Sequence, residues 1–263
     1  MLYYPQLSTG AVSQFPMTRR RTLRTISNTL ASGDTIRMSD PGASAVRWQL
    51  HYSGLTDAEW SSIEQLFEAT EGQLNTFTFL DPADNLLMWS EDWTKPEWIT
   101  DPMLQISGGI ADPSGGSSGV AITNTGQAAQ RVYQTIAAAS WFQYCFGIYL
   151  RCDALASVQV FSLSTGQETA LDATVGPAWT RIVKADSLTQ QQDGVSFGLQ
   201  LAAGAKVYAF GPQVEAQVSP GIYKKTTDRG GVYPQTRFET DTLALMTGAP
   251  NQNSALVQLV SRM

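Results

Sequence analysis

The chain has 263 residues, of which 43% are hydrophobic and only 15% charged, and its formal net charge is −6 at pH 7. The apolar content excludes a disordered chain, while the low charge content, against about 25% in a typical soluble domain, suits a β-rich protein partly covered by neighbours. The acidic balance disfavours nucleic acid as the main partner, and no apolar run approaches the roughly 18 residues of a membrane span.

Two features bear on the compartment. The first ten residues lack the basic and apolar regions of a secretory signal, so we expect synthesis in the cytoplasm and a protein that stays soluble or enters an assembly. Cys145 and Cys152 flank a predicted strand. In an extended chain they would be roughly 23 Å apart, at ~3.3 Å per residue, whereas a disulfide needs Cα atoms within about 7 Å. Free structural thiols are therefore expected, and a bridge requires the chain to turn back.

The N-terminal region reads as strands and turns. Val46, Trp48, Leu50 and Tyr52 alternate with polar residues, which predicts a strand with one buried face. The segment 40–42, Asp-Pro-Gly, predicts a turn before it.

Four arginines gather ahead of this strand, at Arg19, Arg20, Arg21 and Arg24. They could touch phosphate or an acidic protein surface. A solvated strand edge or a salt-bridge patch between subunits is the favoured interpretation.

One amphipathic helix is predicted over residues 56–71. Thr56 and Glu59 form a capping box, Leu55 and Trp60 are placed as a hydrophobic staple, and Gly72 is a suitable C′ residue. Its apolar stripe should pack on a sheet. A further strand with Phe77 and Phe79 follows, so the first 88 residues give sheet, helix and sheet.

The residue composition then changes twice along the chain. Residues 89–98 are aromatic and turn-rich, and residues 108–119 have the composition of a flexible loop. From about 120 to 218 short strands recur between turns, which predicts a β-sandwich, most simply a jelly roll. The C-terminal strand is too short to fold alone and must pair with the first domain. We therefore expect a mainly β protein: a discontinuous domain of residues 1–88 and 222–263, and an insert of residues 89–221.

The flanks resemble the distal tail proteins of gene transfer agents and related long-tailed phages. The resemblance is carried by the order of the strand with Trp48, the capped helix ending at Gly72, the Phe77-Thr78-Phe79-Leu80-Asp81-Pro82 segment, and the closing Arg237-Phe238-Glu239-Thr240-Asp241 stretch before the last strand. The start of the chain, around residues 18–30, departs from the usual opening of that family.

The insert resembles carbohydrate-binding-module-like jelly rolls of phage tail tips. The likeness lies in residues 89–98, residues 144–151 and the ending Gly211-Pro212-Gln213-Val214-Glu215 with Tyr223. Together these resemblances imply a structural virion protein, a ring subunit at the tail tip, usually a hexamer. The implied partners are further copies, the tail tube protein, the baseplate hub and host surface polysaccharide through the insert.

Enzymatic chemistry has little support in the sequence. His51 is the only histidine, no G-x-S-x-G elbow accompanies it, and a surface or interface role is favoured. One histidine and two cysteines make no zinc ligand set, and no phosphate-binding glycine motif occurs. The acids at positions 59, 64, 68 and 71 read as a solvated helix face rather than a hydrolytic pair. We expect no enzyme and no cofactor.

A structural calcium ion is the alternative left open, because jelly rolls offer carboxylates and carbonyls in loops. Asp92, Asp101 and Asp112 lie in loops of that kind, although turn formation is their favoured role.

Tryptophans are the remaining ligand candidates, because a sugar can stack its apolar face on an indole ring. Trp89, Trp93 and Trp98 are favoured as packing residues near the junction, so Trp141 and Trp179 become the candidate glycan contacts. Three hypotheses follow: a tail-tip ring subunit, a carbohydrate-binding tail adhesin, and, with least support, a tail-associated glycan hydrolase.

Overall fold

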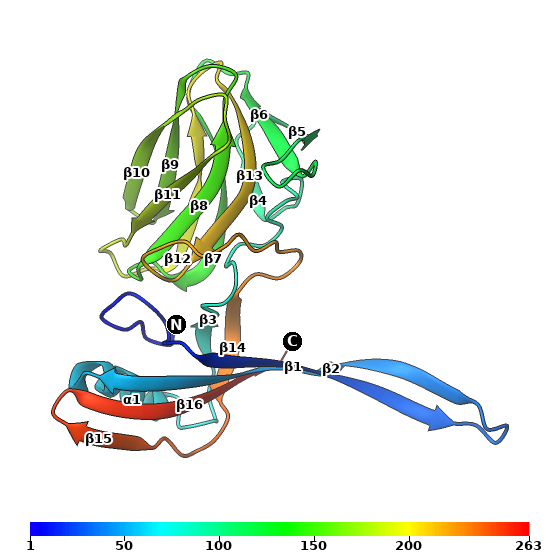
Figure 1. Cartoon of the computed structure of the whole chain (residues 1–263), viewed down its shortest axis with the longest axis vertical. Coiled ribbons are helices and arrows are strands. Elements are labelled where there is room, and N and C mark those ends of the chain that lie inside the picture. Colours follow the sequence, from blue (N-terminus) through cyan, green and yellow to red (C-terminus); the bar gives the residue numbers. More distant parts are fainter. Residues whose placement is uncertain (263) are drawn as a thin grey trace. The chain divides into compact units, whose positions relative to one another are not determined.

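The computed structural model describes residues 1–262, which divide into two compact units. Unit 1 comprises residues 1–8, 13–79 and 233–262, and unit 2 comprises residues 9–12 and 80–232. The predicted domain limits at residues 88 and 222 therefore differ from the observed limits by about ten residues at each junction. The connections that flank the insert pack with the insert itself, as the contacts below explain. The chain is mainly β, as predicted (Figure 1).

Unit 1 is built on one sheet with strand order β1-β2-β16-β14-β3, and β15 pairs with β16. The strands are β1 (Met17–Thr29), β2 (Thr35–Leu55), β3 (Phe77–Leu80), β14 (Val232–Phe238), β15 (Leu245–Ala249) and β16 (Gln252–Arg262). The C-terminal strand β16 pairs antiparallel with β2, Leu259 opposite Trp48. The prediction that the last strand completes the first domain is thus confirmed.

The core of unit 1 lies between one face of this sheet and helix α1 (Asp57–Ala69). Trp48 and Leu50 are fully buried on that face, as their alternation predicts. Phe67 of the helix meets Phe238 of β14 edge to face, with ring centroids 5.0 Å apart. The core is therefore aromatic, and the helix is held by packing rather than by propensity alone.

Both ends of helix α1 follow the sequence signals. Thr56 is the N-cap, and its hydroxyl accepts from the Glu59 amide while the Glu59 carboxylate accepts from the Thr56 amide, so the predicted capping box is confirmed. The helix ends earlier than predicted, at Ala69, because both Glu71 and Gly72 have positive φ angles of 51° and 65°. Gly72 accommodates this conformation at no steric cost.

Strands β1 and β2 continue together as a hairpin beyond the other strands of the sheet (Figure 1). Residues 40–42 do not form the predicted turn. They lie inside β2, where the register slips between the pairs Thr22–Ala45 and Arg24–Asp40. A proline and a glycine are tolerated there because a bulge frees residues from the ladder.

Unit 2 is a jelly roll of two five-stranded sheets, β10-β9-β12-β7-β4 and β11-β8-β13-β6-β5. Strands β6 to β13 follow the jelly-roll order in which the first and last strands, then the second and second-last, lie side by side. Their bounds are β4 (Trp98–Thr100), β5 (Leu104–Ile110), β6 (Gly119–Asn124), β7 (Gln130–Ala139), β8 (Tyr144–Arg151), β9 (Ala156–Ser164), β10 (Gln167–Val175), β11 (Thr180–Asp186), β12 (Asp193–Leu201) and β13 (Lys206–Glu215).

The two sheets enclose a second core. Phe197 of one sheet contacts both Tyr144 and Phe146 of the other, at 5.3 and 5.9 Å between ring centroids. The loop predicted as flexible is partly strand, since β5 extends to Ile110, and the Asp112 carboxylate accepts backbone N–H groups from the turn that follows.

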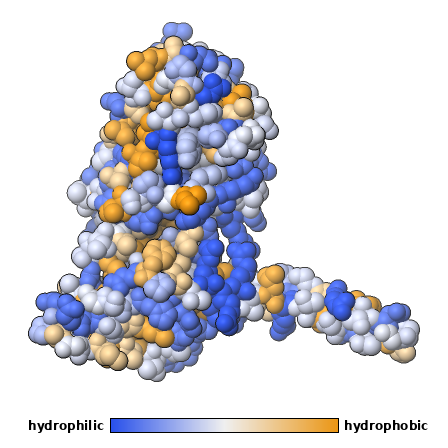
Figure 2. Space-filling view, viewed as in Figure 1, coloured by the Kyte–Doolittle hydropathy of each residue, from blue (hydrophilic) through white to orange (hydrophobic). Residues whose placement is uncertain are grey.

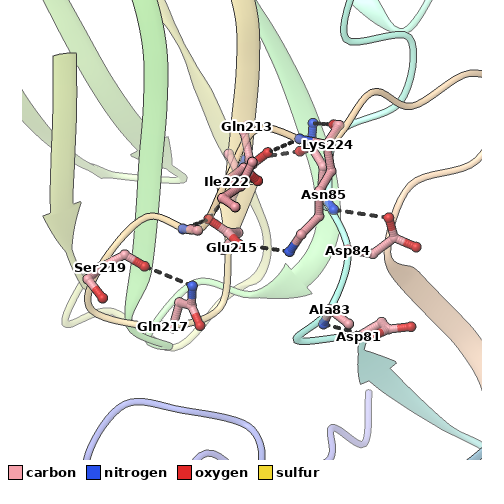
Figure 3. A network of polar contacts seen from close by, with 12 residues as sticks. Asp81, Ala83, Asp84, Asn85, Gln213, Glu215, Gln217, Ser219, Ile222 and Lys224 are labelled. Carbon is pink, nitrogen blue, oxygen red and sulfur yellow. Dashed lines mark hydrogen bonds and ion pairs between the residues drawn. The ribbon is translucent and has the colours of Figure 1, made fainter. Parts of the chain in front are cut away.

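Three buried polar side chains fasten the two connections of unit 2 to strand β13 (Figure 3). The Asn85 side-chain oxygen accepts from the amides of Leu87 and Val214, and its NH₂ group donates to the carbonyls of Pro212 and Lys224. The observed limits of unit 2 lie outside the predicted insert because these bonds tie residues 80–88 and 222–232 to the sandwich.

Gln213 and Glu215 complete this network. The Gln213 carbonyl oxygen accepts the Lys224 amide at 2.6 Å, and its NH₂ group donates to Glu215. The Glu215 carboxylate, 1% exposed, also accepts the Gly221 amide at 2.7 Å and the Lys224 ammonium at 3.1 Å. The charge is buried, but it is paired and fully hydrogen-bonded.

Asn85→Ala should destabilise unit 2 by about 3 kcal/mol, because it leaves buried donors and acceptors of the connections without partners. Urea unfolding followed by tryptophan fluorescence measures the change. Gln217→Ala is the matched control, since Gln217 makes one solvent-accessible bond to Ser219, and it should change stability by less than about 0.5 kcal/mol. Equal effects of the two variants would contradict this role.

The capping box also predicts an acid dependence of unit 1. Burial raises the pKa of Glu59, but hydrogen bonds from Ser8 and Thr56 outweigh it and lower the pKa to about 2. The stabilisation is therefore present above the ordinary value of 4.5 and is lost as the pH falls toward 2. The urea midpoint of Glu59→Gln should fall less between pH 5 and pH 2.5 than that of the wild type; Glu64→Gln, on the exposed side of the helix, should behave as the wild type.

Candidate functional site

The two outward faces of the jelly roll differ in how much of them is available. The face of the β11-β8-β13-β6-β5 sheet is partly covered by the segment after β13. Tyr223 lies against Gly211, where a Cβ atom would come within 3.0 Å of the ring, and meets Phe210 at 5.1 Å. Arg181 donates to the Gly221 carbonyl at 2.8 Å. The polar network described above holds this cover in place.

The outward face of the β10-β9-β12-β7-β4 sheet, here called the open face, carries three rows of side chains. The register defines them: Ile99, Tyr133, Gly198, Phe161 and Ala170 form the central row; Arg131, Gln200, Gln159 and Asp172 form a second; and Thr135, Ser196, Leu163 and Glu168 form a third. The residues that alternate with them, such as Val132 and Leu199, are fully buried in the core. The sheet therefore separates an apolar inner face from a polar outer one.

Arg131 crosses the central row of the open face. Its guanidinium lies 4.9 Å above the Phe161 ring and donates to Gln200 at 2.6 Å and to Glu168 at 2.9 Å. Since the two partners come from strands β12 and β10, one side chain ties three strands together. Stacking on the ring and one hydrogen bond to each of two partners orient the guanidinium, a role that lysine would not fill.

Glycine at position 198 shapes the floor of the open face. A Cβ atom there would come within 2.2 Å of the Val132 carbonyl and 2.5 Å of the Tyr133 Cβ. Only glycine leaves room here for Tyr133, whose ring is partly exposed and has its centroid 6.1 Å from that of Phe161. The result is a single partly exposed aromatic ring bordered by polar groups, because Phe161 itself is fully buried.

The border of the open face offers fixed hydrogen-bonding groups. The side-chain NH₂ group of Gln159 donates to Asp172 at 3.0 Å, and this bond fixes the orientation of the Gln159 side-chain carbonyl. The hydroxyls of Thr135 and Ser196 are 2.8 Å apart. Amides, carboxylates and a guanidinium can each engage two neighbouring hydroxyls, and a flat ring can take the apolar side of a sugar. The arrangement is suited to binding a polyhydroxylated chain.

The predicted glycan contacts lie elsewhere. Trp141 precedes β8 and Trp179 precedes β11, whose first residue Thr180 pairs with Leu150 at the far end of β8. The two tryptophans thus lie at opposite ends of β8, roughly 23 Å apart at ~3.3 Å per residue, too far to form one site. Their roles in binding remain predictions.

Trp179 does have polar neighbours. It is partly exposed and lies 5.4 Å from the Arg151 guanidinium, which covers Tyr208 at 4.1 Å. The Tyr208 hydroxyl is 2.7 Å from the Lys206 ammonium and 3.1 Å from Asp153. This alternation of rings and cations is a second arrangement able to contact a ligand, although Tyr208 itself is only 9% exposed.

The tryptophans near the junction are packing residues, as favoured from the sequence. Trp93 and Trp98 are buried and stack with centroids 4.3 Å apart and an interplanar angle of 14°. The Trp98 indole donates to the carbonyl of Trp89.

The three carboxylates considered for calcium are hydrogen-bonded within the protein, Asp92 and Asp112 inside their own loops and Asp101 to strand β7. The Asp92 carboxylate accepts a hydrogen bond from the Thr94 hydroxyl and pairs with Lys95. The Asp101 carboxylate accepts the backbone amide of Arg131 at 2.7 Å. Asp112 accepts three backbone amides; burial raises its pKa, but these bonds outweigh it and lower the pKa. Within residues 1–262, no group of three or more His, Cys, Asp or Glu side chains is positioned to hold a metal.

The remaining candidates lie outside the open face. His51 is exposed on the outer face of strand β2 in unit 1. Cys145 and Cys152 are buried free thiols, as expected from their spacing. Burial raises the pKa of Cys145 to about 11, so this thiol stays protonated at neutral pH.

No helix in the described part of the chain has the length and hydropathy needed to cross a membrane.

Comparison with known proteins gives structural similarities only. No protein-family model and no curated protein matches the chain. The enzymatically active domain of bacteriophage CBA120 tailspike protein 4 is similar over 52% of this chain and 22% of its own, with 10% identity and a TM-score of 0.40. Membership of the distal tail family therefore remains a prediction.

Carbohydrate-binding modules are also among the similar structures. The CBM22-1 xylan-binding domain of Paenibacillus barcinonensis Xyn10C matches 52% of this chain and 97% of its own, with 14% identity and a TM-score of 0.42. The tandem CBM22-1-CBM22-2 domain of the same protein matches 66% of this chain and 60% of its own, with 14% identity and a TM-score of 0.43. All these scores are low, and the jelly roll is defined by its own strand order.

Proposed function

We propose that unit 2 is a carbohydrate-binding module and that it binds a polysaccharide chain on its open face. The observation that carries the proposal is the arrangement of Arg131 over Phe161, beside Tyr133 and the amides of Gln200 and Gln159. An uncovered sheet face accepts an extended polymer, with stacking on the ring and hydrogen bonds along the border. Binding without hydrolysis is expected, because the two acids that border the central row are engaged by neighbouring side chains: Glu168 accepts from Arg131 at 2.9 Å and Asp172 accepts from Gln159 at 3.0 Å.

Tyr133→Ala should weaken binding of the cognate polysaccharide at least tenfold, because it removes the ring surface at the centre of the open face. Calorimetry or a glycan array with the full chain measures this, using soluble xylan and host surface polysaccharides as probes. Trp179→Ala and Trp141→Ala are the controls and should bind as the wild type. Loss of binding in Trp179→Ala with retention in Tyr133→Ala would place the site beside Arg151 instead.

A second function is proposed for unit 1: a subunit of a tail-tip ring, hexameric by resemblance, that joins a tail tube to a hub in the virion. The projecting hairpin favours an assembly role. Its surface bears apolar as well as polar residues (Figure 2). The apolar ones include Leu23, which is 71% exposed, and Ile36 and Met38, at 46% and 48%. A two-stranded hairpin is marginally stable alone, so contact with a neighbour would stabilise it.

The purified chain should therefore form an oligomer of fixed subunit number, measured by size-exclusion chromatography with light scattering and by electron microscopy. Binding of glycans should be retained in the oligomer. A strict monomer, both alone and in purified particles, would contradict the ring while leaving the carbohydrate-binding proposal intact.

A further inference from the structure

Unit 1 carries a row of like charges across the sheet face opposite the helix. Arg20 lies opposite Arg47, Arg47 opposite Val260, and Val260 opposite Arg237, so three arginines share one row over four strands. Arg262, opposite Ala45, extends the set into the neighbouring row. Like charges directly opposite one another destabilise a sheet. The residues Arg20, Arg47, Arg237 and Arg262 are here called the arginine face.

The arginine face is hollow rather than flat. A groove of about 1000 Å³ is lined by Arg47, Arg237 and Arg262 together with Arg24 of the hairpin, and a second of about 420 Å³ is lined by Arg20 and Arg47. Two carboxylates lie in these grooves: Glu239 pairs with Arg47 at 2.7 Å and Asp40 pairs with Arg24. The cations outnumber them, so the grooves retain positive charge.

Helix α1 presents the opposite charge on the other side of the same sheet. Glu64 and Glu68 are exposed and lie four residues apart on one flank, in line with Asp57. Like charges at this spacing destabilise a helix. The last turn also contains an acid and no base, whereas the helix dipole favours positive charge at the C-terminal end. Within residues 1–262, neither glutamate has an ion pair.

We propose that the arginine face binds the acidic flank of helix α1 of a second copy of this chain. Each surface bears charges that are unfavourable within the monomer and complementary between monomers. Because the two surfaces lie on opposite sides of one sheet, the contact is head-to-tail, and it repeats to form a closed ring or a filament. The proposal deepens the ring function given above and rests on it, by naming the surfaces that join the copies.

A second copy fits the arginine face better than a nucleic acid does. The carboxylates of Glu239 and Asp40 lie within the grooves, where they would repel a phosphate backbone. Carboxylates of a helix are discrete and can pair with Arg20 and Arg262, which have no ion pair within residues 1–262, whereas a polyanion requires a continuous basic path.

Charge reversal tests the contact in the full chain. Arg262→Glu and Glu68→Arg, each alone, should raise the self-dissociation constant at least tenfold in sedimentation experiments, because each places like charges across the interface. Wild-type association should weaken as salt rises from 50 to 500 mM. Arg229→Glu, an exposed reversal in unit 2, is the matched control and should associate as the wild type.

Mixing provides the decisive measurement. An equimolar mixture of Arg262→Glu and Glu68→Arg chains should recover association, since the acidic face of one then meets the basic helix of the other; circular dichroism establishes that both are folded. An oligomeric wild type that neither reversal affects would overturn the proposed surfaces but leave the ring in place. A monomeric wild type would overturn both, whereas DNA binding by the arginine face that Arg262→Glu abolishes without altering association would overturn the proposed surfaces alone.

Discussion

The structure depends on the polar network that holds together the two connections of unit 2. An insert can interrupt a sheet domain only if its first and last residues leave close to one another. Here Asp81 donates to the Gly231 carbonyl and Gly231 donates to that of Asn85, while the Asn85 side chain reaches both β13 and the exit segment. These bonds allow β3 and β14 to belong to one sheet although 151 residues separate Leu80 from Val232.

The same network decides which face of the jelly roll is available. By fixing the exit segment with Gln213 and Glu215, it places Tyr223 over Gly211 and covers part of one sheet. The outer rows of the other sheet instead hold polar groups that bind one another, above all Arg131 with Gln200 and Glu168. Preorganised polar groups lose little freedom when a ligand arrives, which favours binding.

Local signals in the sequence predicted a large part of the fold. The capping box of Thr56 and Glu59, the alternation around Trp48 and the recurrent short strands all correspond to observed elements, because each depends on neighbouring residues. The prediction of a turn at residues 40–42 was wrong, because a Pro-Gly pair is also accommodated at a bulge within a strand. The helix ended early because Glu71, an unlikely residue for positive φ, adopts it before Gly72.

The candidate site was harder to predict because it is made by register between strands distant in sequence. Arg131, Phe161, Glu168 and Gln200 stand in no motif, and only the pairing of β7, β12, β9 and β10 brings them together. Trp141 and Trp179, predicted as glycan contacts because they are large rings in turns, lie at opposite ends of β8, and their part in binding stays a prediction. One sequence signal was available: the alternation in residues 131–136, whose outward members are Arg131, Tyr133 and Thr135. Gln213 and Glu215 of the segment 211–215 act structurally, which the motif alone could not indicate.

The two proposed functions support each other energetically. An open sheet face with a single partly exposed ring gives few contacts, so the affinity of one site for a polymer is modest. Copies joined through unit 1 would present several such faces to one polysaccharide surface, and each later contact then forms at a high effective concentration. A weak site is therefore compatible with firm attachment, provided that self-association holds the copies together. The charge separation of unit 1, with arginines on the sheet and glutamates on the helix, is the feature by which one fold could supply that association without enlarging its apolar surface.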